Sequence, residues 1–218
     1  MRGFSIIFYI KDKYVMTNLT WDNVSFRQYL DILEIWKDPE IGEADRAAEV
    51  CDILFGVDIL KMPITEASKY TKALKILTVK VPDNQPLDSI TVNGIQYEVT
   101  TDVANLTVAQ FYDFDAAIRN GGKEIDNYPQ IMACFIKPVG TVYGEGYNTQ
   151  RVAEDVLDMP VTVVSSMAAF FLGWYKRYIK ISLLFLRLKR MRMPKTARKR
   201  MKEEIKQMEA ALNGAFSD

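Results

Sequence analysis

The stretch VSFRQYLD at residues 24–31 has a counterpart in LTVAQFYD at residues 106–113, 82 positions further along the chain. Ser25 is a good candidate N-cap, because a serine hydroxyl accepts a hydrogen bond from the first turn of a helix. Apolar side chains then recur at helical spacing from Phe26 to Trp36. The two stretches therefore predict two amphipathic helices of one pattern, over about 25–37 and 107–119.

Two further matches follow in the same order. VCDIL at residues 50–54 aligns with MACFI at 132–136 at the same offset, and MPIT at 62–65 aligns with MPVT at 159–162 at an offset of 97. The second copy thus carries about fifteen additional residues, which coincide with a stretch rich in Gly and Tyr at 138–148. Matches in a fixed order indicate an internal duplication. We expect each copy to consist of a strand, a capped helix, a second helix, a loop and a helix that begins at proline.

A period of two replaces the helical period between the two copies. Residues 90–92 and 95–99 flank Asn93-Gly94, a pair that supplies the positive φ angles of a type I′ turn. The sequence therefore predicts a β-hairpin here, and FSIIFYI at residues 4–10 is expected to form another strand. Further helices are expected over about 43–55, 63–77, 128–136, 150–157 and 160–191, with a last one from Pro194.

These patterns predict an α+β fold that is predominantly α. Two related helical units are accompanied by a small β-hairpin sheet and followed by a long basic C-terminal helical arm. We expect the N-terminal strand and the first helical unit within residues 1–78, and the hairpin and the second helical unit within 79–175. The basic arm is expected over residues 176–218.

Charge is distributed unevenly along the chain. The 28 Lys and Arg balance the 28 Asp and Glu over 218 residues. Residues 174–218, however, hold thirteen basic and four acidic side chains, a net charge of +9, which leaves −9 for residues 1–173. Such polarity indicates either a tail that binds something anionic or two ends that complement each other in an assembly.

The chain lacks residues that several common kinds of catalysis require. The chain contains no histidine, the commonest general base and zinc ligand, so every Ser-His or Cys-His arrangement is excluded. Cys51 and Cys134 stand alone in apolar stretches, which indicates buried free thiols. The acidic residues at 113–126 lack the spacing of a cation site, and the glycines at 140–146 lack the Lys-Ser/Thr of a phosphate loop. We therefore expect no catalytic residue, no metal and no cofactor, and a protein that is not an enzyme.

One group of candidate interaction residues lies in the Gly/Tyr stretch. Tyr143 and Tyr147 stand among glycines, and tyrosines in an exposed loop are typical of a docking surface.

The second group lies at the start of the positively charged segment. Ile179, Leu183 and Leu186 alternate with basic side chains, which indicates a basic amphipathic helix. Its candidate contact residues are Trp174, Lys176, Arg177, Lys180, Arg187, Arg190 and Arg192. We expect residues 174–214 to project as one or two long helices whose apolar side is covered by a neighbouring molecule or by lipid. A helix packed on its own domain, with a solvated basic face, is the alternative.

No run of about 18 uninterrupted apolar residues is present, and residues 1–10 lack the features of a signal peptide. We therefore expect the protein to reside in a cytoplasm.

Four phrases of this sequence carry a resemblance to a known group of proteins. They are LTWDNVSFRQYLDI, GIQYEVTTDVANLTVAQFYDF, IMACFIKPVGTVYGEGY and LDMPVTVVSSMAAFF, and they span roughly residues 20–175. The chain resembles proteins of tailed bacteriophages, notably the crAss-like phages and other phages of Bacteroidetes. In layout it is similar to virion-associated and tail-assembly-chaperone-type proteins encoded among structural genes.

The resemblance implies a virion structural or virion-associated protein that acts through protein–protein contacts. It would be a component of the tail or portal region, or a cargo protein that is packaged and ejected. Its partners would be portal, tail or capsid proteins, and it would occupy the host cytoplasm during assembly and then the virion. Two alternatives stay open: a tail assembly chaperone absent from the virion, and a peripheral binder of nucleic acid or membrane through residues 176–218. Formation of a homo-oligomer is compatible with each.

Overall fold

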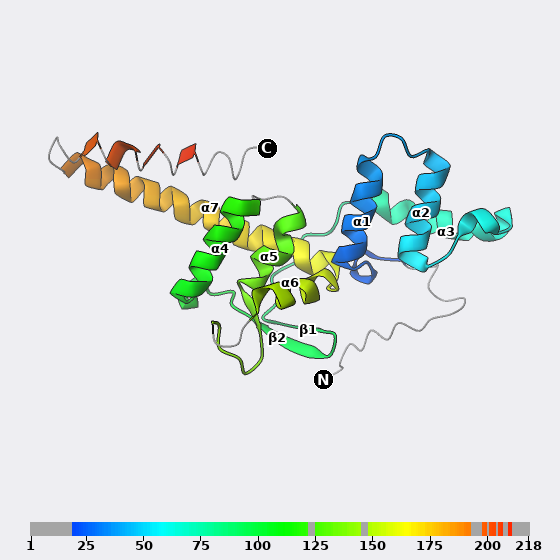
Figure 1. Ribbon diagram of the computed structural model, residues 1–218, viewed down its shortest axis with the longest axis horizontal. Helices are drawn as coiled ribbons and strands as arrows, with labels where there is room; N and C mark the ends of the chain where they lie inside the picture. The colour runs from blue at the N-terminus through cyan, green and yellow to red at the C-terminus, as the bar shows by residue number, and fades with distance from the viewer. Residues whose placement is uncertain are drawn as a thin grey trace.

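The computed structural model describes residues 19–121, 125–144, 148–192, 198–199, 201–203, 205–206 and 209–210. Most of these residues are helical, and three short strands form one antiparallel sheet, so the predicted α+β, predominantly α class is confirmed. In Figure 1, α1 to α3 form one end of the molecule, α4 to α6 surround the first half of α7, and the second half of α7 extends outward. The strand expected at residues 4–10 and the helix start expected at Pro194 lie outside the described residues.

The first unit is a helical hairpin followed by a shorter helix. Its elements are the 3₁₀ turn η2 (Trp21–Asn23), α1 (Phe26–Lys37), α2 (Glu43–Phe55), η3 (Ile59–Lys61), α3 (Ile64–Ala73) and η4 (Leu74–Thr78). Helix α1 begins where the sequence predicts, because the Ser25 hydroxyl accepts a hydrogen bond from the Gln28 N–H. Helix α2 ends at Gly56, whose φ of 65° is the left-handed conformation that glycine tolerates best.

The central sheet contains the predicted hairpin and one strand more. Strand β1 (Ser89–Val92) pairs with β2 (Ile95–Val99), and the turn residues Asn93 and Gly94 have φ angles of 50° and 76°. Strand β3 (Ile136–Pro138) adds to β2 in antiparallel register. The expected helix over 128–136 is therefore too long: α5 ends at Ala133, and the buried Ile136 lies in a strand. Pro138 is tolerated at this end of the ladder because β3 is an edge strand.

The second unit repeats the order of the first with an insertion. Its elements are η5 (Val103–Asn105), α4 (Val108–Gly121), η6 (Ile125–Asn127), α5 (Tyr128–Ala133), β3, α6 (Thr149–Leu157) and α7 (Val161–Arg192). The insertion consists of β3, the following loop and most of α6, which together separate α5 from the proline that precedes α7.

The two units make the same hydrogen bonds at the start of their first helices. In the first unit, the Gln28 side chain accepts from the Ser25 N–H at 3.0 Å and donates to the Ile53 carbonyl, at the end of α2, at 2.8 Å. In the second unit, the corresponding bonds join Gln110 to Thr107 at 3.0 Å and to the Cys134 carbonyl, just after α5, at 3.2 Å. A glutamine thus ties the N-terminus of one helix to the C-terminal end of the next in both units.

The proline turns also correspond, and here the sequence match is longer than four residues. DILKMPIT at residues 58–65 aligns with DVLDMPVT at 155–162, and four backbone hydrogen bonds recur at this offset of 97. Each bond runs from a backbone N–H to a backbone carbonyl. In the first unit the donor and acceptor residues are Lys61 and Asp58, Met62 and Ile59, Glu66 and Pro63, and Ala67 and Pro63. In the second unit they are Asp158 and Asp155, Met159 and Val156, Val163 and Pro160, and Val164 and Pro160. These shared bonds support an internal duplication, whereas the domain boundaries at 78 and 175 stay predictions.

The main core surrounds the first half of α7. Val161, Val164 and Phe171 are fully buried there, as the apolar composition of residues 161–174 predicts. The Phe171 ring stacks on Phe135 with centroids 3.6 Å apart, and Phe114 packs edge-on against Phe135. Helices α1, α4, α5 and α6 and the hairpin all contribute to this core, while a smaller cluster joins α2 to α3.

In the second half of α7, the apolar side that contains Ile179 and Leu183 is covered by the chain's own residues. Ile179 and Leu183 are buried in the same cluster as Met201 and Ile205, and Arg187 pairs with Glu209 at 2.5 Å. In Figure 1 the short described pieces between residues 198 and 210, coloured orange to red, lie alongside the second half of α7. The expectation that a neighbouring molecule or lipid covers this side is therefore wrong, because the chain covers it itself.

Candidate interaction surfaces

An inter-unit junction joins the start of α1 to the start of α7. We define it as residues 24–26 of the first unit and residues 159–161 of the second. Ser25 and Pro160 form an isolated antiparallel bridge, in which the Phe26 N–H donates to the Met159 carbonyl at 2.8 Å and the Val161 N–H donates to the Val24 carbonyl at 2.9 Å. Val24, Phe26, Met159 and Val161 are all completely buried. The junction thus satisfies the first N–H of each helix and seals the two units together.

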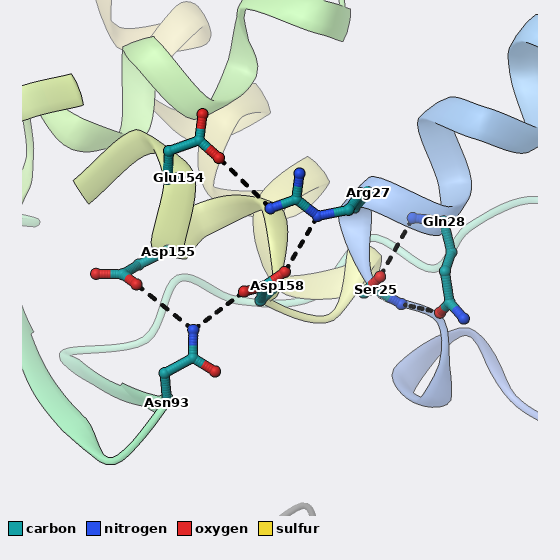
Figure 2. Close-up of polar contacts among 7 residues, drawn as sticks. All are labelled: Ser25, Arg27, Gln28, Asn93, Glu154, Asp155 and Asp158. Carbon is teal, nitrogen blue, oxygen red and sulfur yellow. Dashed lines mark hydrogen bonds and ion pairs between the residues drawn. The ribbon is translucent and has the colours of Figure 1, made fainter. Parts of the chain in front are cut away.

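Charged side chains surround this junction. Figure 2 shows Arg27 of α1 reaching two carboxylates of the second unit, Asp158 at 3.3 Å and Glu154 at 3.5 Å. In the same view, the Asn93 amide of the hairpin turn donates to Asp158 at 3.0 Å and to Asp155 at 3.5 Å. Asp158 therefore links α1, the hairpin and the α6–α7 connection.

Of the two candidate tyrosines in the loop, the structure describes Tyr143. The Tyr143 hydroxyl donates to the Asp113 carboxylate of α4 at 2.7 Å, and the side chain is half-buried. Tyr143 therefore holds the loop against the second unit. Tyr147 lies outside the described residues.

Trp174 belongs to an aromatic cluster between α4 and α7. Its ring lies 6.1 Å from Phe114 and 6.4 Å from Phe111, and it stacks on Tyr178 at 5.7 Å. Phe111 also contacts Tyr178 at 5.2 Å. The half-buried Trp174 thus lies between the phenylalanine rings of α4 and the exposed Tyr178.

The basic candidates lie along the outer part of α7. Lys176, Arg177 and Lys180 are exposed, Arg187 is exposed and paired with Glu209, and Arg190 is half-buried. The side chain of Arg192 lies outside the described part of the chain.

A feature that the sequence reading missed is a second apolar stripe on α7, opposite the buried one. We call it the α7 stripe; its members are Phe170 and, eight residues further on, the set Tyr178, Ile181, Leu184 and Leu188, which are spaced three or four residues apart. Ile181 is 68% exposed and Leu184 is 58% exposed, although both lie at helical spacing from their neighbours on the stripe. The signal was present in the spacing, but helical spacing alone does not say which of two apolar stripes the chain covers.

A groove also opens between α1, residues 77–83 and the first half of α7. Its volume is about 620 Å³, and Tyr29, Trp36 and Tyr128 contribute aromatic surface to it. The Trp21 ring nitrogen donates to the Val79 carbonyl at 3.0 Å, which holds one wall in place.

Both cysteines are buried in the described part of the chain. Burial raises the pKa of the Cys51 thiol to about 11 and that of the Cys134 thiol to about 12, whereas a nucleophilic cysteine needs a lowered pKa. Within the ranges that the structure describes, no three metal-binding side chains cluster together. No helix in the same ranges is long and apolar enough to cross a membrane.

Comparison of the chain with protein-family models, with curated proteins and with solved structures found no match.

Proposed function

We propose that this chain is a non-catalytic assembly protein of a tailed bacteriophage, and that it enters the virion by binding other structural proteins through the α7 stripe. The resemblance of residues 20–175 to phage proteins supports the phage origin. The α7 stripe is the observation that supports the mode of action.

The stripe has the composition of a protein-binding surface. Exposed aliphatic and aromatic side chains lie in one row on a rigid helix, with the exposed cations Lys176 and Lys180 beside them. Covering one such side chain on binding contributes at most about 1.5–3 kcal/mol, and this must offset the cost of association, so several members of the stripe must be covered together. Basic side chains at the rim steer an acidic partner into register.

The position of the stripe supports the same role. Its members Ile181, Leu184 and Leu188 belong to the second half of α7, which extends beyond α4 to α6 (Figure 1). The covered side of α7 holds the helix to its own chain through Ile179 and Leu183, so the stripe is presented on a supported helix.

The test is incorporation of stripe variants into particles. The double variant Ile181→Glu, Leu184→Glu places two charges on the stripe. The new carboxylate at position 181 stands four residues after Arg177, a spacing at which opposite charges attract on a helix, so the variant should keep α7 helical. We expect the wild-type chain in purified particles and the double variant only in the unassembled fraction. Val142→Glu, at an equally exposed site in the loop, is the matched control and should be incorporated normally.

Incorporation of the double variant at the wild-type level would contradict the role of the stripe. If the variant is excluded and neutralising Lys176 and Lys180 instead abolishes a salt-sensitive binding to DNA, the nucleic-acid alternative takes the place of this proposal.

A further inference from the structure

The duplication gives each unit both halves of the inter-unit junction, but the chain uses only one set. In the used set, residues 24–26 of the first unit meet residues 159–161 of the second. The unused set consists of residues 106–108, which correspond to 24–26, and residues 62–64, which correspond to 159–161.

The unused halves have the same backbone groups available. In the junction, the first N–H of each helix donates to a carbonyl of the other unit. The corresponding donors are the N–H groups of Val108 and Ile64, and the corresponding acceptors are the carbonyls of Met62 and Leu106. Within the described ranges none of these four groups makes a hydrogen bond. Pro63 has φ −59° and ψ 143°, close to the polyproline II conformation.

The side chains show the same contrast. Phe26 and Val161 are fully buried in the junction, whereas their counterparts Val108 and Ile64 are 72% and 87% exposed. Two large aliphatic side chains at matching positions of both halves are thus left in water, although the same positions are sealed elsewhere in this chain.

We propose that a second copy of this chain completes the junction: residues 106–108 of one copy pair with residues 62–64 of the next. The two surfaces differ, so the contact is heterologous and joins copies head to tail into a ring or a filament. Every unit in such an array meets the next through the same bridge, within a chain and between chains. The contact does not depend on the virion role proposed above.

Charge makes this contact weaker than the one inside the chain. Ala109 stands where Arg27 stands in the first unit, and Lys61 stands where Asp158 stands in the second, so the ion pairs of Figure 2 have no counterpart. We therefore expect association that depends on protein concentration.

The first experiment is sedimentation velocity of the full chain over a wide concentration range. We expect the wild type to associate, and Ile64→Asp and Val108→Asp each to weaken association by about tenfold or more, since each places a charge in the apolar contact. Both sites are exposed first-turn positions, where aspartate favours a helix, so folding is retained. Val142→Asp is the exposed control and should associate like the wild type. A wild type that stays monomeric at every concentration overturns the proposal, as does loss of association on Ile181→Asp but not on Ile64→Asp.

A second experiment identifies the register. Ser25 and Pro160 are directly opposed in the bridge, so the variant with Ser25→Cys and Pro160→Cys should close a disulfide within one chain and serves as the positive control. Pro63→Cys on one copy and Thr107→Cys on another should then give a disulfide between chains when mixed and oxidised, with little linkage in either variant alone. Equal linkage in the separate variants and in the mixture contradicts the proposed pairing.

Discussion

Replacing Gln110 tests whether the helix-to-helix tie of the second unit stabilises the fold. Gln110 is 4% exposed, and its side chain accepts from the Thr107 N–H at 3.0 Å and donates to the Cys134 carbonyl at 3.2 Å. Methionine has a similar length and no amide, so Gln110→Met removes these bonds, and with them the bond that the Thr107 hydroxyl donates to the Gln110 side-chain oxygen at 3.1 Å, and creates little empty space.

The expected cost follows from the groups left without partners. A buried carbonyl that loses its donor costs about 1–3 kcal/mol, and loss of half of a capping box costs about 0.5–1 kcal/mol more. Gln110→Met should therefore lower the free energy of unfolding by about 1.5–4 kcal/mol. Gln28 makes the corresponding bonds in the first unit but is only half-buried, so water replaces its amide and Gln28→Met should cost about 1 kcal/mol.

Urea unfolding followed by circular dichroism measures both variants against the wild type, with Gln130→Met, at an exposed position of α5, as the control. We expect the order Gln110, Gln28, Gln130 from largest to smallest loss. A Gln110 variant within about 0.5 kcal/mol of the wild type, or one less affected than the Gln28 variant, would refute the reasoning from burial.

Four further experiments test other parts of the structure. Gly94→Val should cost about 1–2 kcal/mol, because an added Cβ meets no atom within 4 Å but a β-branched residue resists the φ of 76°; an unchanged urea midpoint would count against the turn. Arg27→Ala should cost about 0.2–1 kcal/mol at low salt and less at high salt, since its ion pairs are exposed; a loss that is indifferent to salt would contradict this. Because burial raises the pKa of Cys51 and Cys134 to about 11 and about 12, neither thiol should react with Ellman's reagent in the folded protein at neutral pH; rapid stoichiometric labelling would show that the thiols are accessible. In the unfolded chain both thiols ionise near pH 8.5, whereas in the folded protein they stay protonated at that pH. The free energy of unfolding should therefore be highest below about pH 8.5 and should fall as the pH rises above it. A urea midpoint that stays flat from about pH 8 to about pH 9.5 would contradict this expectation.

The local elements could be predicted from the sequence because their signals are local. The cap at Ser25 and the Asn93-Gly94 turn each act within a few residues, and the structure has elements at these places. Strand β3 was missed because Ile136 continues an apolar run that also suits a helix. Its strand conformation comes from pairing with β2, a contact 37 residues away in sequence between Val99 and Ile136.

The candidate surfaces could be predicted only in part. The basic residues of α7 were placed on an amphipathic helix, but the sequence did not say that Met201 and Ile205 lie in the same buried cluster as Ile179 and Leu183. Which of the two apolar stripes of α7 is covered depends on tertiary contacts, which helical spacing does not reveal. The inter-unit junction could not be predicted from the sequence either, because it depends on a bridge between Ser25 and Pro160 that the repeat pattern does not indicate.

The proposed role rests most directly on where the protein is found after assembly. Quantitative mass spectrometry of purified particles, compared with the lysate of the infected cells, measures its copy number relative to the portal and tail proteins. A virion assembly protein should be present in the particles at a fixed ratio to those proteins. A chain that is abundant in the lysate and absent from the particles would contradict a place in the virion and would favour the assembly-chaperone alternative.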